Sequence, residues 1–218
     1  MTSNWKHNLP TVLTFSRLAL APVILAVLIT SSIVCWCEEP FWRAKEKVYS
    51  RIQNREIVVS VRAAPRTSGM KNLLSIAGGG QVDAPCAFVF AASKDFEAFA
   101  RQTGYVDRAK FDPVTQILEA RLSAYGLKAD IAFKMVAGDS AMTYAVLKGP
   151  MTGMKGEFKF IPAGAAKCDV GIDGEFAYDK FPVPQFFLSF GMEVMLQRMA
   201  GRLRSYSEEL YQKKGVVR

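Results

Sequence analysis

The sequence predicts an α+β fold in which a curved antiparallel sheet wraps around a long C-terminal helix, behind an N-terminal hydrophobic helix. Three patterns support this prediction. Between residues 114 and 178, five runs alternate apolar and polar side chains, which is typical of strands with one buried face. An apolar stripe at helical spacing follows, from about Pro184 to Gln212. An uncharged run from Leu18 to Cys37 precedes both. One long amphipathic helix is thus available to cover the apolar face of one sheet.

The uncharged run is long enough to span a hydrocarbon core of about 30 Å as a helix. Residues 1–37 are therefore expected to be an uncleaved membrane anchor or a cleaved signal peptide. The basic residues just after the run, Arg43, Lys45, Lys47 and Arg51, favour retention of the domain in the cytoplasm. A secretory interpretation puts the domain outside. We expect a membrane-associated protein of the cell envelope, with a single N-terminal span or exported to a periplasmic or extracytoplasmic compartment.

Two regions follow the hydrophobic run. Residues 38–55 are charged and predicted to be a helical connector, and residues 56–214 are predicted to be a ligand-binding domain. The domain opens with a strand at Glu56–Val61, rich in β-branched residues, and a second strand within residues 70–82. The glycines Gly78 to Gly80 lack the Lys-Ser/Thr of a phosphate loop, so they indicate a bulge or a close backbone approach.

One helix is predicted next, with Asp83 as its N-cap, Pro85 in its first turn and Gly104 at its end. The five alternating runs then form an antiparallel meander that is apolar on one face and solvated on the other. Asp169, Asp173 and Glu175 fall on the face predicted to be solvated.

The chemistry available to the predicted domain is limited. His7, the single histidine, precedes the hydrophobic run, which excludes Ser-His-Asp and Cys-His mechanisms and most zinc geometries from the domain. We predict no catalytic residue, metal or cofactor. The candidates for acid–base work are expected to be mostly solvated surface groups; they are Tyr125, Tyr144, Asp173, Glu175 and Glu193. Glu193 could instead form a polar anchor at a cavity mouth with Arg198, or an exposed pair with it.

Four cysteines are too few for a disulfide scaffold in 218 residues. Cys35 and Cys37 lie in the hydrophobic run. Cys86 and Cys168 are expected to be buried free thiols, because they can pair only if the fold brings them together.

The net charge is +8, of which Lys6 and Arg17 contribute two before residue 38. Basic and acidic residues are interleaved in the remainder, which indicates a solvated surface. No alternation of aromatic and basic residues resembles a nucleic-acid platform, so no nucleic-acid partner is predicted.

Three segments carry a resemblance to a known superfamily. They are GGGQVDAPCAFVFAASKDFEAFAR, the pair LKGPMTGMKGEFKFIP and KCDVGIDGEFAY, and the closing GMEVMLQRMAGRLRSYSEELY. Together they resemble the START-like (SRPBCC) helix-grip superfamily, which includes polyketide cyclases and coenzyme Q-binding proteins. The likeness covers about residues 70–212. It implies a cavity between the sheet and the C-terminal helix for a lipid, quinone, sterol or polyketide.

We expect this domain to bind or transport a hydrophobic small molecule or lipid at or near a membrane, without catalysis. Two alternatives stay open: a cyclase or isomerase acting on a hydrophobic substrate, and a membrane-tethered interaction module with a closed cavity. The predicted ligand-binding residues are Leu118, Leu122, Ile131, Phe133, Met135, Met142, Tyr144, Phe158, Phe160, Ile172, Met192, Met195 and Met199.

Overall fold

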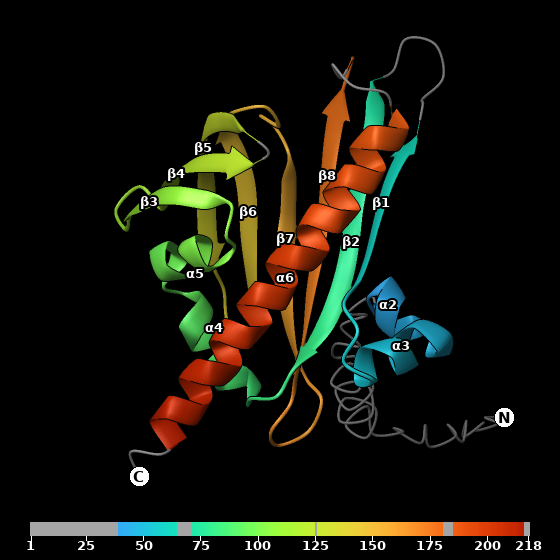
Figure 1. Cartoon of the computed structure of the whole chain (residues 1–218), viewed down its shortest axis with the longest axis vertical. Helices are drawn as coiled ribbons and strands as arrows, with labels where there is room; N and C mark the ends of the chain where they lie inside the picture. Colours follow the sequence, from blue (N-terminus) through green and yellow to red (C-terminus); the bar gives the residue numbers. More distant parts are fainter. Residues whose placement is uncertain (1–38, 65–70, 125, 181–184, 216–218) are drawn as a thin grey trace, which may run out of the picture. The chain divides into compact units, whose positions relative to one another are not determined.

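A curved antiparallel sheet with a long helix along its concave face dominates the structure (Figure 1). The computed structural model describes residues 39–64, 71–124, 126–180 and 185–215. The expected anchor or signal peptide, residues 1–37, therefore lies outside the described residues. The elements, in chain order, are α2 (Phe41–Ala44), α3 (Glu46–Gln53), β1 (Val58–Ala64), β2 (Asn72–Val82), α4 (Cys86–Ser93), α5 (Phe96–Gln102), β3 (Val106–Asp112), β4 (Ile117–Ala124), β5 (Leu127–Ala137), β6 (Ala141–Lys148), β7 (Lys155–Pro162), β8 (Cys168–Tyr178) and α6 (Gln185–Gly215).

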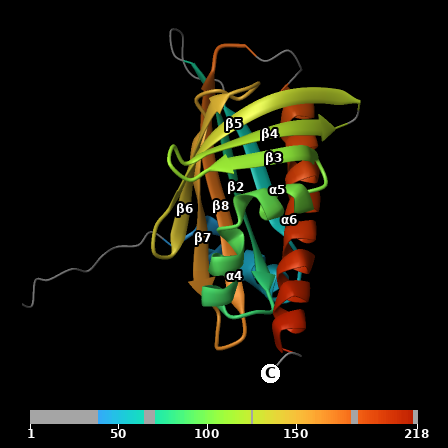
Figure 2. The same cartoon turned by 90° about the vertical axis from the view of Figure 1, so that its left-hand side faces the viewer.

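The eight strands form one sheet in the order β1-β2-β8-β7-β6-β5-β4-β3. Strands β3 to β8 form a meander, and β2 joins its last strand, so the first strands of the domain pair with the last. The β3–β5 end of the sheet curls across the top of the molecule toward α6, while α4 and α5 lie below it (Figure 2). This arrangement confirms the predicted fold class.

Two local predictions were wrong. Strand β3 was not predicted, because it is an edge strand with only Ala109 buried and therefore lacks an apolar alternation. The single helix predicted from Asp83 is two helices, because α4 ends with Lys94 as its C-cap and α5 begins at Phe96. The Asp95 side chain caps α5 by accepting a hydrogen bond from the Ala98 N–H, whereas Pro85 occupies the N-cap position of α4.

The predicted connector is helical and packs against the outer face of the sheet through Trp42 of α2. Trp42 is fully buried, and its indole lies over Gly79 of β2 and Gly171 of β8, which are paired across the two strands. A Cβ atom on either glycine would lie under 3.0 Å from the ring. The predicted close approach at the triple glycine is therefore confirmed, and the approaching group is an aromatic side chain.

Asp169 is fully buried, contrary to its predicted place on a solvated face. The tertiary packing of α3 overrides the strand alternation here. The Tyr49 hydroxyl donates to Asp169 Oδ2 and the Gln81 amide donates to Oδ1, each at 2.9 Å. Burial and the adjacent carboxylate raise the pKa of the Tyr49 hydroxyl, so it remains a donor. This buried group therefore joins α3 to the sheet.

Each edge strand receives a glutamate from a helix. The Val61 N–H of β1 donates to Glu193 Oε1 of α6 at 2.8 Å, and the Phe111 N–H of β3 donates to Glu97 Oε1 of α5, also at 2.8 Å. Unpaired edge N–H groups invite pairing with other chains, and these contacts satisfy one on each side. Glu193 is thus an anchor to β1 and not a partner of Arg198.

Within the part of the chain that the structure describes, no helix combines the length and apolar character needed to cross a membrane.

Replacing Gly171 by Ala should destabilise the fold by about 1–3 kcal/mol, because the new Cβ would lie 2.7 Å from Trp42 Cζ2 and the rigid indole must move. Urea unfolding of the purified protein measures this change. The matched control is Gly191→Ala, where no atom lies within 4 Å and a helical alanine should be neutral or stabilising. Equal stability of the Gly171→Ala variant and the wild type would contradict the packing of Trp42.

Candidate functional site

A cavity of about 360 Å³ lies between the concave face of the sheet and α6. Residues from β1 to β8 form its wall, and α4, α5 and α6 close it. This volume falls within the range of small-molecule sites, about 300–1,000 Å³. The lining residues follow α6 from Met192 to Ser207, about 22 Å along the helix axis at 1.5 Å per residue. The cavity is therefore elongated.

All thirteen residues predicted to bind ligand line this cavity. Their strand positions alternate, so one face of each strand points inward, and the α6 positions repeat every three to four residues. Whether these side chains contact a ligand stays a prediction. The wall also includes residues that were not predicted, among them Val59, Ile76, Val89, Phe99 and Leu196.

Methionines give the wall an unusual character. Seven of them line the cavity among the described residues: Met135, Met142, Met151, Met154, Met192, Met195 and Met199. Methionine has three flexible torsions and a polarizable sulfur, so it adapts to irregular apolar shapes. Aromatic side chains form more rigid parts of the wall. The ring centroids of Tyr144 and Phe158, for example, lie 5.4 Å apart. The wall can thus adjust to apolar molecules of more than one shape.

Among the acid–base candidates that the structure describes, Tyr144 is the one whose side chain lines the cavity. Its hydroxyl end lies against the paired glycines Gly156 and Gly174, where an added Cβ atom would lie under 3.0 Å from the hydroxyl oxygen. That hydroxyl donates to the Asp173 carbonyl oxygen at 3.2 Å. Burial raises the pKa of Tyr144, and the charge of Asp173 adds to this shift, so the hydroxyl stays protonated.

The other acid–base candidates do not join Tyr144. The Asp173 carboxylate pairs with Lys159 at 3.3 Å, and the pKa of Lys159 is raised by its hydrogen bond to Glu157 and by Asp173. Glu175 is exposed, and Glu193 bonds to β1. The side chain of Tyr125 lies outside the described residues.

Sequence reasoning missed Arg204, the one charged side chain among the described residues that line the cavity. The α6 lining follows helical spacing through Met192, Met195, Leu196, Met199, Ala200, Leu203, Arg204 and Ser207. A charge at a position in register with an apolar stripe was the signal that could have revealed it. The Arg204 Nη1 donates to the Arg55 carbonyl oxygen at 2.7 Å.

Arg204 belongs to a group of charges at the start of β1 and the end of β2. The Arg55 guanidinium donates to both oxygens of Glu208, at 2.8 and 2.9 Å, and pairs with Asp83 at 2.6 Å. The Asp83 N–H also donates to Glu208. Burial would raise the pKa of Glu208, but the hydrogen bonds and charge of Arg55 outweigh it and hold that pKa below its ordinary value. These bonds fix α6 to the sheet.

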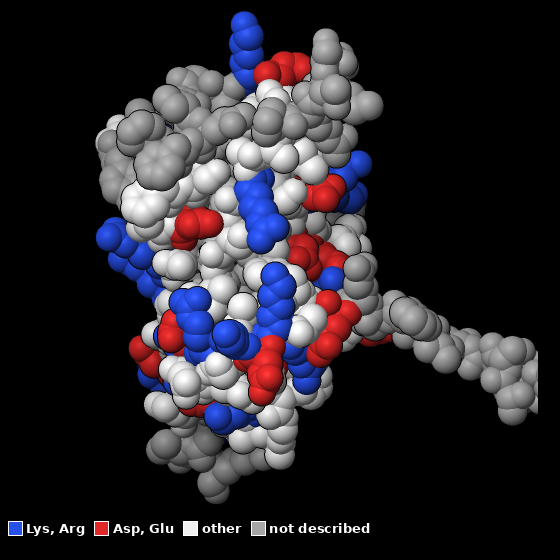
Figure 3. Space-filling view, turned by 90° about the vertical axis from the view of Figure 1, so that its right-hand side faces the viewer, with Lys and Arg blue, Asp and Glu red and all other residues white. Residues whose placement is uncertain are grey.

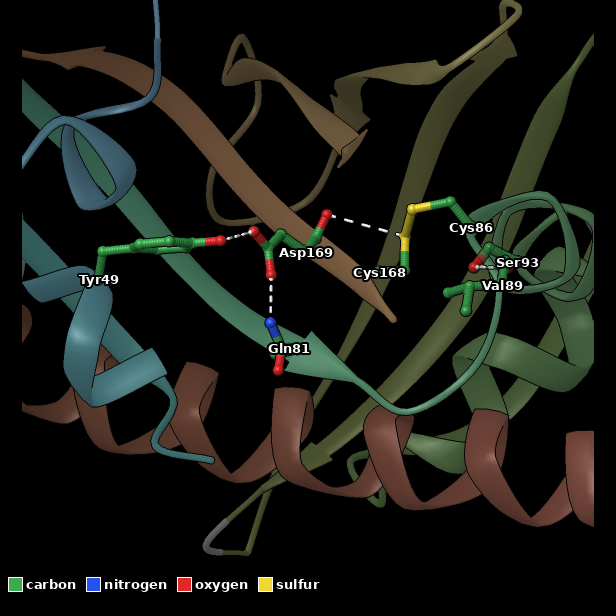
Figure 4. Close-up of a disulfide and its surroundings, with 7 residues drawn as sticks. All are labelled: Tyr49, Gln81, Cys86, Val89, Ser93, Cys168 and Asp169. Atoms are coloured by element: carbon green, nitrogen blue, oxygen red, sulfur yellow. Dashed lines mark hydrogen bonds between the residues drawn. A yellow bond between two sulfur atoms is a disulfide. The ribbon is translucent and has the colours of Figure 1, made fainter. Parts of the chain in front are cut away.

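Cys86 and Cys168 form a disulfide, so the prediction of free thiols was wrong (Figure 4). Their Cα atoms lie 4.7 Å apart despite 82 residues of sequence separation. Val82, at the end of β2, pairs with Cys168, at the start of β8, and α4 begins four residues after Val82. The strand register therefore brings the first residue of α4 to Cys168. The bond joins α4, a wall of the cavity, to the central sheet.

Charged side chains of both signs are interleaved on the face that includes α2, α3 and β1 (Figure 3). Alternating signs produce little net field over such a surface. No cluster of His, Cys, Asp and Glu that could hold a metal ion occurs in the described portion of the chain.

The solved structures that resemble this chain share its fold. No family model matches the sequence, and no curated protein does either. A START superfamily protein from Mycobacterium smegmatis aligns with 62% of this chain and 98% of its own length, at 16% identity and a TM-score of 0.55. The protein TTHA0849 from Thermus thermophilus aligns with 64% of this chain and 98% of its own length, at 16% identity and a TM-score of 0.53.

A further similar structure belongs to a larger, di-domain protein, and this chain aligns with about half of it. The di-domain ARO/CYC StfQ from the steffimycin biosynthetic pathway aligns with 66% of this chain and 52% of its own length, at 12% identity and a TM-score of 0.55. The chain therefore has the START-like helix-grip fold, as the sequence resemblance indicated. At these identities the likeness concerns the fold alone.

Replacing Glu208 by Gln should remove part of the acid sensitivity of the fold. Because the folded pKa of Glu208 lies below its ordinary value of 4.5, the carboxylate stabilises the fold above that pH. This contribution is lost as the pH falls through the folded pKa. The stability difference between wild type and variant should therefore shrink between about pH 5 and pH 3.

Urea unfolding at a series of pH values measures the effect, with Glu209→Gln, an exposed neighbour on α6, as the control. A difference that stays constant with pH would contradict the ion pair with Arg55.

Proposed function

We propose that this protein binds and carries a hydrophobic molecule in the cavity between the sheet and α6. The observation that carries the proposal is the cavity itself, whose wall is almost wholly apolar. Each buried CH₂ group of a ligand contributes about 0.8 kcal/mol, from which the cost of association is subtracted. The methionines would adapt the wall to the shape of the ligand. The START-like fold agrees with this proposal.

A cyclase or isomerase is the second candidate, and the likeness to StfQ, a di-domain ARO/CYC protein, is the observation that favours it. Such chemistry needs a group that can donate or accept a proton at the cavity wall. Among the described lining residues there is no Asp, Glu, Lys or His. Tyr144 has a raised pKa and donates its hydrogen bond to a backbone carbonyl. Binding without chemistry therefore fits the wall better.

A closed interaction module is the third candidate. It requires an interior filled by side chains, whereas a cavity of about 360 Å³ remains between the sheet and α6. We therefore favour a carrier over this module as well.

We also propose that the domain acts at a membrane, in an oxidising compartment. The uncharged run from Leu18 to Cys37 supports attachment to a membrane or export across it. The disulfide between Cys86 and Cys168 supports the outer side, because disulfides persist in oxidising compartments and are rare in the cytosol. This argument counts against the cytoplasmic placement that the basic residues after the run favour.

Replacing Met195 by Trp should weaken binding of phenylnaphthylamine, a neutral apolar fluorescent probe, by about tenfold or more, because the indole would occupy the cavity. Fluorescence titration measures the affinity, and thermal unfolding checks that the variant folds. Gln197→Trp is the control, since Gln197 is exposed two residues away on the same helix. Failure of the wild type to bind this probe and to retain any extractable lipid or quinone would overturn the carrier proposal.

The disulfide should be present in living cells that produce the full chain. Cells are quenched with acid, free thiols are alkylated before lysis, and linked peptides are identified by mass spectrometry. A peptide pair joined through Cys86 and Cys168 is expected. Alkylation of both cysteines in the quenched cells would contradict the oxidising compartment.

A further inference from the structure

Four hydroxyl groups that line the cavity already donate a hydrogen bond within the protein. The Ser93 Oγ donates to the Val89 carbonyl and the Ser207 Oγ to the Leu203 carbonyl, at 2.8 and 2.9 Å. The Thr103 Oγ1 donates to the Ala100 carbonyl at 2.8 Å, and Tyr144 donates to the Asp173 carbonyl. These hydroxyls cannot donate to a ligand without breaking a bond within the fold.

This arrangement penalises oxygen atoms in the buried part of a ligand. A hydroxyl or carbonyl moved from water into the cavity would lose its hydrogen bonds to water and find no free donor along most of the wall. A molecule with oxygen atoms spaced along its length would therefore bind poorly. An unoxygenated hydrocarbon chain incurs no such cost, and it also suits the elongated shape of the cavity.

Arg204 is the one charged side chain among the described residues of this wall. A guanidinium carries five N–H donors, and among the described residues Arg204 uses one bond, to the Arg55 carbonyl oxygen. Arg55 engages the carboxylates of Glu208 and Asp83 directly, whereas Arg204 has no ion pair within 4.0 Å among the described residues. Burial, and then repulsion by Arg55, lower the pKa of Arg204, while attraction by Glu208 and Asp83 offsets part of this shift.

The nearby carboxylates are engaged by other residues. Glu208 and Asp83 bond to Arg55, and Asp83 also lies 4.0 Å from Lys167, so neither carboxylate contacts Arg204, although the charges of both act on it at longer range. A partly buried cation without a direct carboxylate contact is costly, and an anion beside Arg204 would reduce this cost.

We propose that the cavity takes a chain-like amphiphile with one acidic head group, with the hydrocarbon along the methionine-rich wall and the head group at Arg204. The proposal rests on the carrier function argued above and adds the class of its ligand. A carboxylate and a phosphate monoester share the chemistry that Arg204 would recognise, because both accept charge-assisted hydrogen bonds from a guanidinium.

The test compares four ligands of equal chain length on the purified full-length protein. They are octadecanoate, octadecyl phosphate, octadecanol and an octadecanoate hydroxylated at mid-chain, each measured by displacement of phenylnaphthylamine. Octadecanoate or octadecyl phosphate should bind about tenfold more tightly than octadecanol, the usual gain from a hydrogen bond to a charged group. The tighter of the two acids identifies the head group. The mid-chain hydroxyl should weaken binding about tenfold.

Three variants assign the preference to Arg204. Arg204→Gln should bind the acids no more tightly than it binds octadecanol, whereas Arg204→Lys should keep part of the preference for acids. Arg198→Gln, an exposed arginine on the same helix, is the matched control and should keep all of it. Octadecanol binding and thermal unfolding verify that each variant is folded.

The outcomes separate this inference from the carrier function. Equal affinity of the wild type for octadecanol and both acids would overturn the acidic head group while leaving the carrier intact. An acid preference that persists in Arg204→Gln would also overturn it, since the head group would then lie elsewhere, for example at Tyr105, another lining residue. If the mid-chain hydroxylated acid bound as tightly as octadecanoate, the inferred penalty on oxygen atoms in the buried part of a ligand would be overturned. Failure of every ligand and of the probe would remove the carrier function itself.

Discussion

The position of α6 is set by polar bonds to the rim of the sheet, and the cavity depends on that position. Glu193 accepts the Val61 N–H, Arg204 donates to the Arg55 carbonyl, and Glu208 accepts from Arg55 and from the Asp83 N–H. All of these contacts reach β1, Arg55 three residues before it, or Asp83 just after β2. A helix free to maximise apolar contact would sink onto the middle of the concave face. These bonds hold it at the edge, so the strands β4 to β7 face open space.

Glycine pairs let aromatic side chains approach both faces of the same sheet closely. On the outer face, Gly79 and Gly171 accommodate Trp42 of the N-terminal helices. On the inner face, Gly156 and Gly174 accommodate Tyr144. A ring over a glycine pair covers backbone that would otherwise face solvent or the cavity. Helices α2 and α3 are therefore part of the folded unit, fixed by Trp42 and by the hydrogen bond between Tyr49 and Asp169.

The sequence was informative wherever one residue pattern alone decides the local structure. Alternation in β4 to β8 and the stripe of α6 indicated which side chains face inward, and all thirteen predicted residues line the cavity. The failures lie where tertiary contacts override the pattern. Asp169 is buried by α3, and Cys86 meets Cys168 because of the register of β2 with β8. Neither contact leaves a signal in the local sequence, because its partners are distant in the chain.

Three further failures have local causes. The break before α5 was hidden because apolar residues continue across it, although Asp95 is a typical N-cap. Strand β3 was missed because an edge strand needs little apolar surface, and its charged residues face solvent. Arg204 was overlooked for the opposite reason: its apolar neighbours define a stripe so clearly that a charge within it looks like an interruption.

The distribution of polar groups around the cavity supports the proposed binding function. Enzymes keep donors and acceptors uncommitted at the reacting atoms, so that they are available when charge develops in the transition state. Here the hydroxyls of Ser93, Thr103, Tyr144 and Ser207 are committed to backbone carbonyls, and the carboxylates lie at the rim or on the outer face. These four hydroxyls are therefore not available to stabilise a developing charge. The wall can exclude water and conform to a chain, and its one cation among the described lining residues lies where α6 is bonded to the sheet. The same residues that hold the cavity open therefore also mark the end at which a charged group can be received.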